Sequence, residues 1–590
     1  MKDFLKYMAA TVAGIIVFTV IVGGIGVMSI IGMVASESQA KDVADNSVMV
    51  LDLSGMIDER SEDTPLGQLL GEKASTIGLD DILSAIKKAK NNDKIKGIYI
   101  ESGMFVADSY ATLREIRNAL LDFKKAGKWI VAYADIYTQG GYYVASVADK
   151  VLLNPSGQID WHGLAAQPVF YKDLMAKFGV KMQVAKVGKY KSMPEAYTAD
   201  KMSDANREQV SAYINGIWQN VCKEVAGSRN LSVGKLNEYA DNLVTLSDAK
   251  DFVKLKLADK LVYTDGIKAE INKLLKQQAD DDVNTVGLAA MQTLKGEPDK
   301  GDEIAVYYAY GSIVDEAVGG AYGGEHQIVG KDVCEDLKSL MDDDAVKAVV
   351  LRINSGGGSA YASEQIWHYV DMLRQKKPVV VSMGGAAASG GYYIASAANW
   401  IVAEPTTLTG SIGIFGMFPD LSGLLTQKLG IKFDEVKTNR HSAFGTPARP
   451  FNEEEMGYLT KYIERGYGLF KSRVAQGRKM SLAKVEEVAQ GHVWIGQDAL
   501  KVKLVDQLGG IDQAVAKAAS LAKLKEYYTY PYPGKTDWLT QIMNQATGGS
   551  YIDNSLRTTL GEYYEPFMLI KNIKEHSSIQ ARIPFDVNVK

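Results

Sequence analysis

The chain has 590 residues, of which 46% are hydrophobic and 23% are charged, so it is long enough for several domains and has the composition of a globular protein. Its 66 lysines and arginines nearly balance 71 aspartates and glutamates, which argues against a nucleic-acid partner. Two distant cysteines, Cys222 and Cys334, and six scattered histidines form no ligand-spaced cluster. We therefore predict free buried thiols, no disulfide framework, no metal site and no cofactor.

An uncharged apolar stretch, Met8–Ala35, lies near the N-terminus. At about 1.5 Å per residue, a helix of this length crosses a hydrocarbon layer of about 30 Å. Lys2 and Lys6 precede the stretch and acidic residues follow it, so the positive-inside rule leaves the N-terminus in the cytoplasm and exports the remainder. A cleaved signal peptide is the alternative, but its apolar region normally has only about 7–15 residues. We therefore predict that residues 1–45 form a cytoplasmic stub and an uncleaved transmembrane anchor.

After this anchor the sequence repeats itself at a spacing of about 250 residues. Ile95–Ser102 matches Val346–Ile353, and both segments have the apolar pattern of a buried strand. A helix is predicted before each of them, at Asp80–Lys90 in the first copy and at Lys331–Met341 in the second. The order of helix and strand is therefore the same in both copies.

Two later pairs of segments extend the repeat. Lys128–Val151 matches Lys377–Val402, and both contain the motif GGYYxAS. Phe178–Lys186 matches Leu429–Lys437, and we expect a strand in each. Because strands alternate with helices through both copies, the sequence predicts an α/β fold built from parallel βαβ units with right-handed crossovers.

These matches divide the exported part of the chain into two copies and a tail. We expect the first copy to span residues 46–297, the second to span residues 302–547, and a C-terminal tail to occupy residues 548–590. The end of the chain contains aromatic residues among polar ones. It could be an interface element or an anchor close to the membrane, but we favour a capping helix.

The second copy contains a candidate nucleophile at the end of a predicted strand. The apolar run Val379–Val381 begins that strand, small residues follow, and a helix is predicted from Gly390. Ser389 lies at the break, where free N–H groups at the start of a helix would stabilise an oxyanion. The alternative is a tightly packed crossover without catalysis. In the first copy, Gln139 aligns with Ser389, so that copy lacks the hydroxyl.

A glycine-rich loop, Asn354–Ser359, follows another predicted strand of the second copy. Three successive glycines allow positive φ angles and leave N–H groups free to bind an anion or a carbonyl oxygen. The aligned residues of the first copy, Met104–Ala107, are less suited to this. A phosphate cradle is the rival interpretation, but the pattern GxxxxGK(S/T) is absent and no lysine follows the glycines.

The first copy contains a candidate base. Lys191 lies in the segment VGKYKS after the third matching strand, and Ser442 occupies the same register in the second copy. An amine can act as the base for a serine if burial lowers its pKa by about three units. A solvated loop lysine is the alternative. Because one copy has only the lysine and the other only Ser389, we predict that the copies pack together and share one site.

These residues resemble the signal peptide peptidase A (protease IV) family in its long tandem-repeat form, within the crotonase-like and Clp-protease-like superfamily. The resemblance covers nearly the whole chain and rests on VGKYKS, RINSGGGS, SMGGAAASGGYYIA and TLTGSIGIFG. It implies two ClpP-like repeats and a Ser/Lys dyad that cleaves peptides. It further implies Ser389 as nucleophile, Lys191 as general base, the N–H groups of Gly358 and Gly390 as the oxyanion hole, and Ser411 as a residue that helps to hold the lysine.

The same resemblance implies substrates and a location. The expected substrates are cleaved signal peptides and unfolded peptide segments. The expected setting is the inner membrane of a bacterium, with one span and a homotetrameric body on the periplasmic side. The family loop usually reads Asn-Ser-Pro-Gly-Gly-Ser, whereas Gly356 replaces the proline here. The loop is then less preorganised but keeps its backbone donors.

Two other functions remain open from the sequence. A crotonase-like acyl-CoA enzyme would use the same pair of oxyanion donors, but it would need neither the anchor nor Ser389 and Lys191. An inactive membrane scaffold is the other alternative, and the presence of both residues argues against it. If the lysine is misassigned, His441 is the first alternative base.

Overall fold

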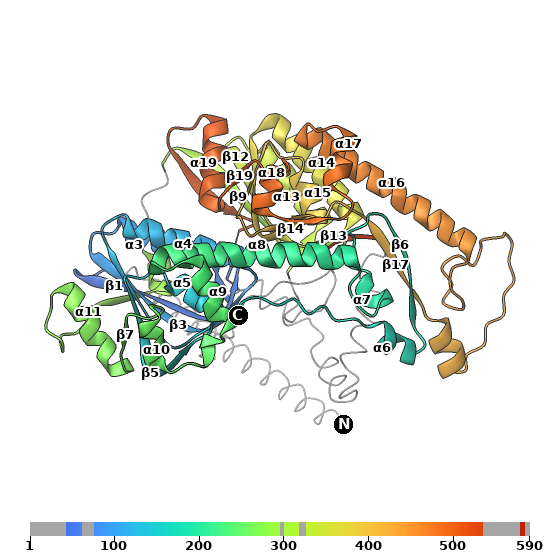
Figure 1. The fold of residues 1–590 in the computed structure, drawn as a ribbon. Coiled ribbons are helices and arrows are strands. Elements are labelled where there is room, and N and C mark those ends of the chain that lie inside the picture. The colour runs from blue at the N-terminus through green and yellow to red at the C-terminus, as the bar shows by residue number, and fades with distance from the viewer. Residues whose placement is uncertain (1–42, 62–75, 295–299, 318–325, 535–578, 584–590) are drawn as a thin grey trace, which may run out of the picture.

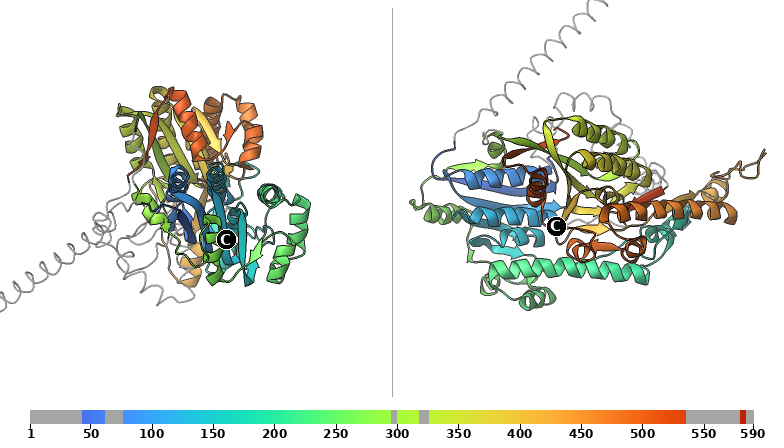
Figure 2. Two further views of the ribbon diagram at one scale, coloured as in Figure 1. Left: turned by 90° about the vertical axis from the view of Figure 1, so that its left-hand side faces the viewer. Right: turned by 90° about the horizontal axis from the view of Figure 1, so that it is seen from above.

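The computed structural model describes residues 43–61, 76–294, 300–317, 326–534 and 579–583. Within these ranges the chain forms two α/β bodies, one from the blue and green segments and one from the yellow, orange and red segments of Figure 1. The two bodies lie against each other in all three views (Figures 1 and 2). The two matching copies of the sequence therefore fold as neighbours.

The first body is built on a seven-stranded sheet in the order β2-β1-β3-β4-β5-β7, with β8 paired to the beginning of β1. The strands are β1 (Ser47–Asp58), β2 (Thr76–Gly78), β3 (Ile95–Ala107), β4 (Trp129–Tyr137), β5 (Lys150–Ile159), β7 (Lys260–Leu261) and β8 (Thr285–Gly287). Each of these pairings is parallel, as the alternation of strands and helices predicts.

Helices surround this sheet and extend from it. They are α3 (Leu79–Asn91), α4 (Tyr110–Lys124), α5 (Gln139–Ala145), α6 (Lys172–Lys177), α7 (Glu195–Thr198), α8 (Asp204–Arg229), α9 (Val233–Asp241), η1 (Val244–Leu246), α10 (Ala249–Lys254), η2 (Thr264–Gly266), α11 (Ile267–Leu275) and α12 (Leu288–Thr293). The long helix α8 runs from the first body along the second in Figure 1, and it contacts β18 of the second body.

The second body is built on an eight-stranded sheet in the order β18-β16-β14-β12-β9-β20, with β15 paired to β14 and β19. The strands are β9 (Asp302–Tyr310), β12 (Val346–Ser355), β14 (Val379–Ala388), β15 (Trp400–Ala403), β16 (Leu408–Gly410), β18 (Val493–Ile495), β19 (Gln507–Leu508) and β20 (Tyr527–Tyr532). The helical elements are α13 (Gly330–Asp342), α14 (Ala360–Lys376), α15 (Gly390–Ala395), η3 (Leu424–Lys428), α16 (Glu453–Arg478), α17 (Leu482–Val488), α18 (Gly496–Lys501) and α19 (Ile511–Ala522). Its pairings are parallel except that between β16 and β18.

A third sheet joins segments from both copies and from the C-terminal tail. It has six strands in the order β11-β10-β13-β21-β17-β6. They are β11 (Gln327–Val329), β10 (Ser312–Val314), β13 (Gly357–Ser359), β21 (Ile579–Arg582), β17 (Phe415–Asp420) and β6 (Lys181–Lys186). Because β6 comes from the first copy and β17 from the second, this sheet holds the two copies in a fixed relation.

Most predicted elements are confirmed with small shifts at their ends. The helix expected at Asp80–Lys90 is α3, and the one expected at Lys331–Met341 is α13. The strand expected at Ile95–Ser102 is the longer β3, and the one expected at Val346–Ile353 is β12. Their apolar residues are buried in the cores of the two bodies, which explains why hydrophobic patterning alone located them.

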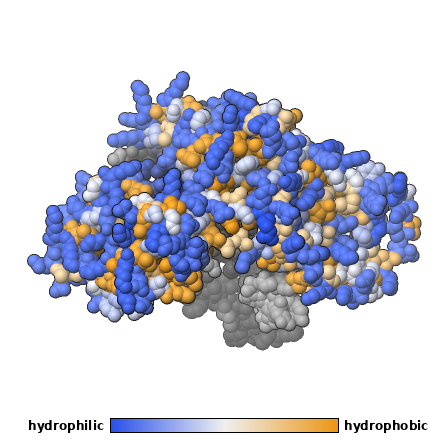
Figure 3. Space-filling model, viewed as in Figure 1, coloured by the Kyte–Doolittle hydropathy of each residue, from blue (hydrophilic) through white to orange (hydrophobic). Residues whose placement is uncertain are grey.

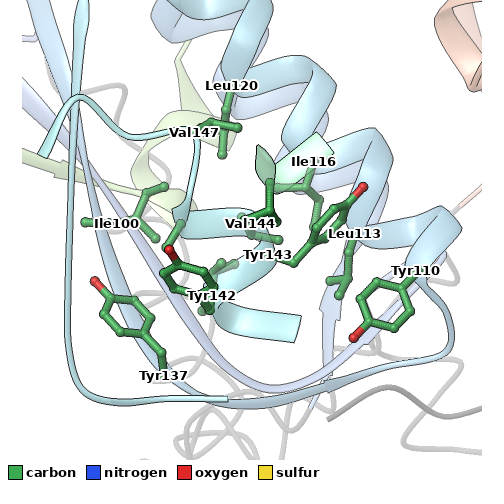
Figure 4. Close-up of a cluster of buried hydrophobic side chains, with 14 of the residues drawn as sticks. Ile100, Tyr110, Leu113, Ile116, Leu120, Tyr137, Tyr142, Tyr143, Val144 and Val147 are labelled. Atoms are coloured by element: carbon green, nitrogen blue, oxygen red, sulfur yellow. The ribbon is translucent and has the colours of Figure 1, made fainter. Parts of the chain in front are cut away.

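The shared Gly-Gly-Tyr-Tyr motif has a packing role in both copies. The hydroxyl of Tyr142 donates to the carbonyl of Leu257 at 2.9 Å, and that of Tyr392 donates to the carbonyl of Leu504 at 2.8 Å. Figure 4 shows Tyr142 and its neighbours within the first core. A buried phenol needs such a partner, so the repeated motif reflects an equivalent core in each body.

The prediction of a strand at Leu429–Lys437 is wrong. These residues are exposed, they form no strand, and Val436 is 99% exposed. The reason is that β17 pairs with β6 along its whole length, whereas residues 429–437 have no neighbouring strand in the described structure to complete a ladder. Ser442, which aligns with Lys191 in the sequence, consequently lies in an exposed turn.

Two further expectations concern the ends of the chain. Among the described residues no helix combines the length and apolar character that a bilayer span requires, and the predicted anchor falls in residues 1–42, outside them. At the other end, Ile579–Arg582 forms a strand, and residues 548–578 and 584–590 of the tail, for which we favoured a capping helix, lie outside the described residues. Hydrophilic residues cover most of the face drawn in Figure 3 and separate small apolar patches.

Candidate active site

Ser389 lies between β14 and α15, at the break that the sequence predicts. Its backbone has φ 54° and ψ −112°, and its N–H donates to the carbonyl of Gly410 at 2.8 Å. Positive φ is costly for a residue with a Cβ and persists only where surrounding structure enforces it. The turn therefore fixes the hydroxyl of a fully buried serine.

Lys191 follows β6 in the first copy and reaches this serine. Its Nζ lies 2.6 Å from Oγ of Ser389, 3.0 Å from Oγ of Ser411 and 3.1 Å from the carbonyl oxygen of Ser411. The structure thus brings together all three side chains that the sequence singled out. Two of them come from the second copy and one from the first, as the complementary pattern predicts.

The environment of Lys191 alters its ionisation. The side chain is 1% exposed, and this burial lowers its pKa well below the ordinary value of 10.5. A buried ammonium loses its hydration, so the neutral amine is favoured. The neutral amine has the lone pair that a general base needs.

Close packing with the second copy positions Lys191. A Cβ added to Gly491, whose φ is 78°, would lie 2.6 Å from the backbone nitrogen of Lys191. Gln209 on α8 donates to the carbonyl of Tyr190 at 3.0 Å and accepts from the N–H of Val493 at 3.1 Å. The first-copy turn is therefore hydrogen-bonded to second-copy strand β18 through one amide side chain.

The glycine loop lies beside the nucleophile. Gly357 has φ 106°, and a Cβ added there would lie 2.9 Å from the backbone nitrogen of Gly390. Oγ of Ser355 accepts from the N–H of Gly357 at 3.1 Å and donates to the carbonyl of Gly311 at 2.6 Å. These bonds fix the loop whose next residue is Gly358, so the two predicted oxyanion donors belong to adjoining segments.

The other serines near the site have structural partners. Ser355 supports the loop, as described above. Oγ of Ser359 accepts from the N–H of Ala362 at 3.2 Å and caps α14. Oγ of Ser382 accepts from Arg352 at 3.0 Å within the sheet. Their hydroxyls therefore serve turns and packing.

The equivalent place in the first copy is closed by Gln139. Its amide nitrogen donates to the hydroxyl of Tyr110 at 3.0 Å and to the carbonyl of Gly163 at 3.1 Å. Its amide oxygen accepts from the N–H groups of His162 and Gly163. The segment that aligns with the glycine loop continues strand β3 to Ala107. The first copy therefore has neither a serine at the position of Ser389 nor a glycine loop beside it.

His441, the alternative base, does not contact the serine in the described structure. Its ring nitrogens lie 3.7 Å from Glu454 and 3.9 Å from Glu455 at the beginning of α16. This segment belongs to the exposed region that includes Ser442. The histidine instead lies beside two carboxylates of the first turn of α16, of which Glu455 is buried.

A buried ionic network beneath the site was not predicted. Arg352 on β12 pairs with Glu59 at 2.8 Å and with Glu115 at 2.6 Å, both from the first copy. The Nδ2 of Asn354 donates to Glu59 at 3.0 Å, and its Oδ1 accepts from the N–H of Ala386 at 3.1 Å. The network thus joins the two copies at the end of β12, the strand that leads into the glycine loop. The sequence feature that could have indicated this network is an arginine inside an otherwise apolar predicted strand, because a buried arginine needs acidic partners.

Comparisons with known proteins add a family assignment to this geometry. The model for Peptidase family S49 matches residues 122–278 and 371–525, and the model for Clp protease matches residues 302–403. The chain is 35% identical to Protease 4 of Salmonella typhi over 581 residues, covering 96% of this chain and 91% of the relative. It is 31% identical to the chloroplastic Serine protease SPPA of Arabidopsis thaliana over 490 residues, covering 82% and 70% of the two chains.

Among solved structures, ClpP1 of Listeria monocytogenes matches 35% of this chain and 91% of its own. The two are 16% identical, with a TM-score of 0.22.

Proposed function

The chain belongs to peptidase family S49 and is a serine protease, and from this we propose that it is a membrane-anchored endopeptidase with a Ser/Lys dyad that degrades cleaved signal peptides. The observation that carries the dyad is the 2.6 Å separation between Nζ of Lys191 and Oγ of Ser389, both buried. A buried amine at this distance from a hydroxyl has the geometry of a base beside its nucleophile.

The proposed mechanism follows from these positions. Neutral Lys191 accepts the hydroxyl proton as Oγ of Ser389 attacks the scissile carbonyl carbon. The N–H groups of Gly358 and Gly390 stabilise the oxyanion. The ammonium then protonates the leaving amine nitrogen as the C–N bond breaks, leaving an acyl-enzyme. Water attacks the ester carbonyl as Lys191 again accepts a proton, and Lys191 returns this proton to Oγ of Ser389 as the ester C–O bond breaks and the carboxylic acid product leaves.

We propose that Ser411 orients the amine. Because Oγ and the carbonyl oxygen of Ser411 lie 3.0 Å and 3.1 Å from Nζ of Lys191, removing Oγ should leave the amine less well directed. Ser411→Ala is expected to lower kcat by roughly 10-fold to 100-fold and to leave KM nearly unchanged. Peptide hydrolysis measured at several substrate concentrations tests this, and an effect confined to KM would assign Ser411 to substrate binding instead.

The pH dependence of the peptidase activity should follow the ionisation of the Lys191 amine. Burial holds the pKa of Lys191 well below 10.5, and only the neutral form can accept the serine proton. We therefore expect kcat/KM for an amide substrate to rise from neutral toward alkaline pH along one ionisation. A profile governed by a group that titrates near the ordinary histidine value of about 6.5 would contradict the lysine assignment.

The proposed location follows from the sequence. Residues 1–45 would form the cytoplasmic stub and the single span, and the catalytic body would face the periplasm from the bacterial inner membrane. Signal peptides left in the membrane after processing would then be close to the site. The domains would span residues 46–297 and 302–547 as two ClpP-like repeats, followed by the tail.

We also propose the homotetramer that the family resemblance implies. Exposed apolar side chains between η3 and α16 support a partner surface: Leu429 is 62% exposed, Val436 is 99% exposed and Phe444 is 49% exposed. Apolar side chains gathered on an exposed segment are typical of an interface.

The proposed function is tested with full-length protein in detergent. We expect a synthetic signal peptide to be cut at internal bonds and a fluorophosphonate to label the protein, both with unaltered enzyme and neither with Ser389→Ala. Retained cleavage in Ser389→Ala would overturn the nucleophile. Labelling without cleavage of the signal peptide would overturn the substrate class.

A further inference from the structure

Strands β12 and β14 lose their common register shortly before the nucleophile. Ile353 on β12 is opposite Met383 on β14, and the next opposed pair is Ser355 with Ala387. Between these pairs β12 therefore has one residue, Asn354, whereas the facing segment of β14 has residues 384–386. Such a bulge removes ladder hydrogen bonds and changes the direction of the strand. The end of β14 consequently needs support from a side chain.

The side chain of Asn354 supplies this support. Its Oδ1 accepts from the N–H of Ala386 at 3.1 Å. A Cβ added to Gly384 would lie 2.9 Å from Cγ of Asn354, so the bulge packs closely against the amide. Ala386 lies three residues before Ser389, and the glycine-rich loop that contains Gly358 begins at Asn354. The amide therefore links the segment that carries the nucleophile to the segment that carries a proposed oxyanion donor.

Two carboxylates of the first copy accept from the other end of this amide. Nδ2 of Asn354 donates to Oδ2 of Asp108 at 2.6 Å and to Oε1 of Glu59 at 3.0 Å. A Cβ added to Gly385 would lie 2.5 Å from Oδ2 of Asp108, so this carboxylate also lies against the bulge. Ionised carboxylates only accept hydrogen bonds. They therefore require the amide nitrogen on their side and leave the amide oxygen for Ala386.

The two carboxylates differ in their other partners. Glu59 accepts from Arg352 on both of its oxygens, at 2.8 Å and 2.9 Å. Oδ2 of Asp108 accepts from Asn354, whereas its Oδ1 accepts from the hydroxyl of Thr112 on α4 at 2.5 Å. Asp108 thus connects a helix of the first copy to the amide that supports the bulge, separately from the ion pair between Glu59 and Arg352.

We propose that Asp108 is a positioning residue of the peptidase site, which holds the amide of Asn354 in the orientation that supports the bulge before Ser389. The first copy then contributes an orienting carboxylate in addition to Lys191. This inference rests on the proposed function, because it takes Ser389 as the reacting group. Asp108 acts through Asn354. Its loss should let the amide turn, so that the nucleophile and the oxyanion donors no longer keep a fixed separation, which slows the chemical step.

Steady-state kinetics of the full-length enzyme with a fluorogenic peptide test this role. Asp108→Ala removes the acceptor and should lower kcat by about tenfold with KM nearly unchanged. Asp108→Asn still offers an oxygen to Nδ2 of Asn354 and can donate to the hydroxyl of Thr112, so kcat should return to within about threefold of the parent value. A loss confined to KM, or an equal loss of kcat in both variants, would overturn the inference.

A double-mutant cycle separates this role from simple support of α4. Asn354→Ala should lower kcat at least as much as Asp108→Ala, and the double variant should be no worse than Asn354→Ala alone. Additive losses would mean that Asp108 acts through α4 and would overturn the inference. Asp122→Ala is the matched control, because this carboxylate also lies on α4 but is 49% exposed and pairs with Lys90. Its kcat should equal that of the parent.

A second measurement does not depend on catalysis. In a Ser389→Ala background, amide hydrogen exchange within residues 384–388 should be slow with Asp108 and about tenfold faster with Asp108→Ala. Faster exchange combined with a parent enzyme that cleaves no peptide would reject the proposed function and retain the role of Asp108 in holding the bulge. Unchanged exchange would reject the inference and leave the proposed function in place.

Discussion

Lys191→Ala is expected to lower kcat/KM for peptide hydrolysis by roughly 10³-fold or more, close to the effect of Ser389→Ala. The reason is that Nζ of Lys191 is the hydrogen-bond partner of Oγ of Ser389, at 2.6 Å. Without it the hydroxyl must lose its proton unaided at the moment of attack. The measurement is hydrolysis of a fluorogenic peptide by full-length enzyme, together with the fluorophosphonate labelling rate.

Lys189→Ala is the matched control for this change. Lys189 lies two residues earlier on the same turn, its side chain is 58% exposed, and it pairs with Glu208 at 3.9 Å. Exposed ion pairs contribute little to stability, so we expect the activity of Lys189→Ala to stay within about twofold of that of the parent enzyme. The double variant Ser389→Ala with Lys191→Ala should be no less active than either single variant, since both groups act in one step. Parent-like labelling of Lys191→Ala would show that another group is the base.

The location of the site could be predicted because its two parts have local signals. Ser389 follows an apolar strand and a run of small residues, and this pattern directly produces the turn between β14 and α15. Lys191 was found by comparing the copies, since Gln139 replaces the hydroxyl in one and Ser442 replaces the amine in the other. Local pattern and internal comparison were therefore sufficient to select the two side chains that the structure brings together.

Features that depend on distant partners could not be predicted in the same way. Leu429–Lys437 matches a strand in sequence, but β17 occupies the edge that it would need. Ile579–Arg582 is too short to show a strand pattern, and both of its partners lie more than 150 residues away. Strand pairing is decided by which edges are available in the folded chain, and a single sequence does not state this.

The second prediction with a large expected effect concerns the buried ionic network around Arg352. Arg352→Met is expected to destabilise the protein by about 3–5 kcal/mol, because it leaves buried carboxylates without their cation. The side chains of Glu59 and Glu115 are only 2% and 3% exposed, so water cannot replace the guanidinium. Chemical denaturation followed by circular dichroism measures the change. Loss of the Arg352 side chain should also reduce peptidase activity, since Asn354 in the same network supports the glycine loop.

Arg440→Met is the control for this substitution, because Arg440 is 76% exposed and pairs with Glu454 at the surface. We expect it to cost less than about 1 kcal/mol. Desolvation of Glu59 outweighs the attraction of Arg352 and raises the pKa of Glu59 to about 7. A raised carboxyl pKa means that the folded state binds this proton more tightly than the unfolded state, so ionised Glu59 opposes folding above that pH. The penalty of Arg352→Met should therefore shrink as the pH falls from about 8 toward 5, where Glu59 is protonated with or without the arginine. A penalty that stays constant over this range would mean that lost packing, not an uncompensated charge, accounts for the destabilisation.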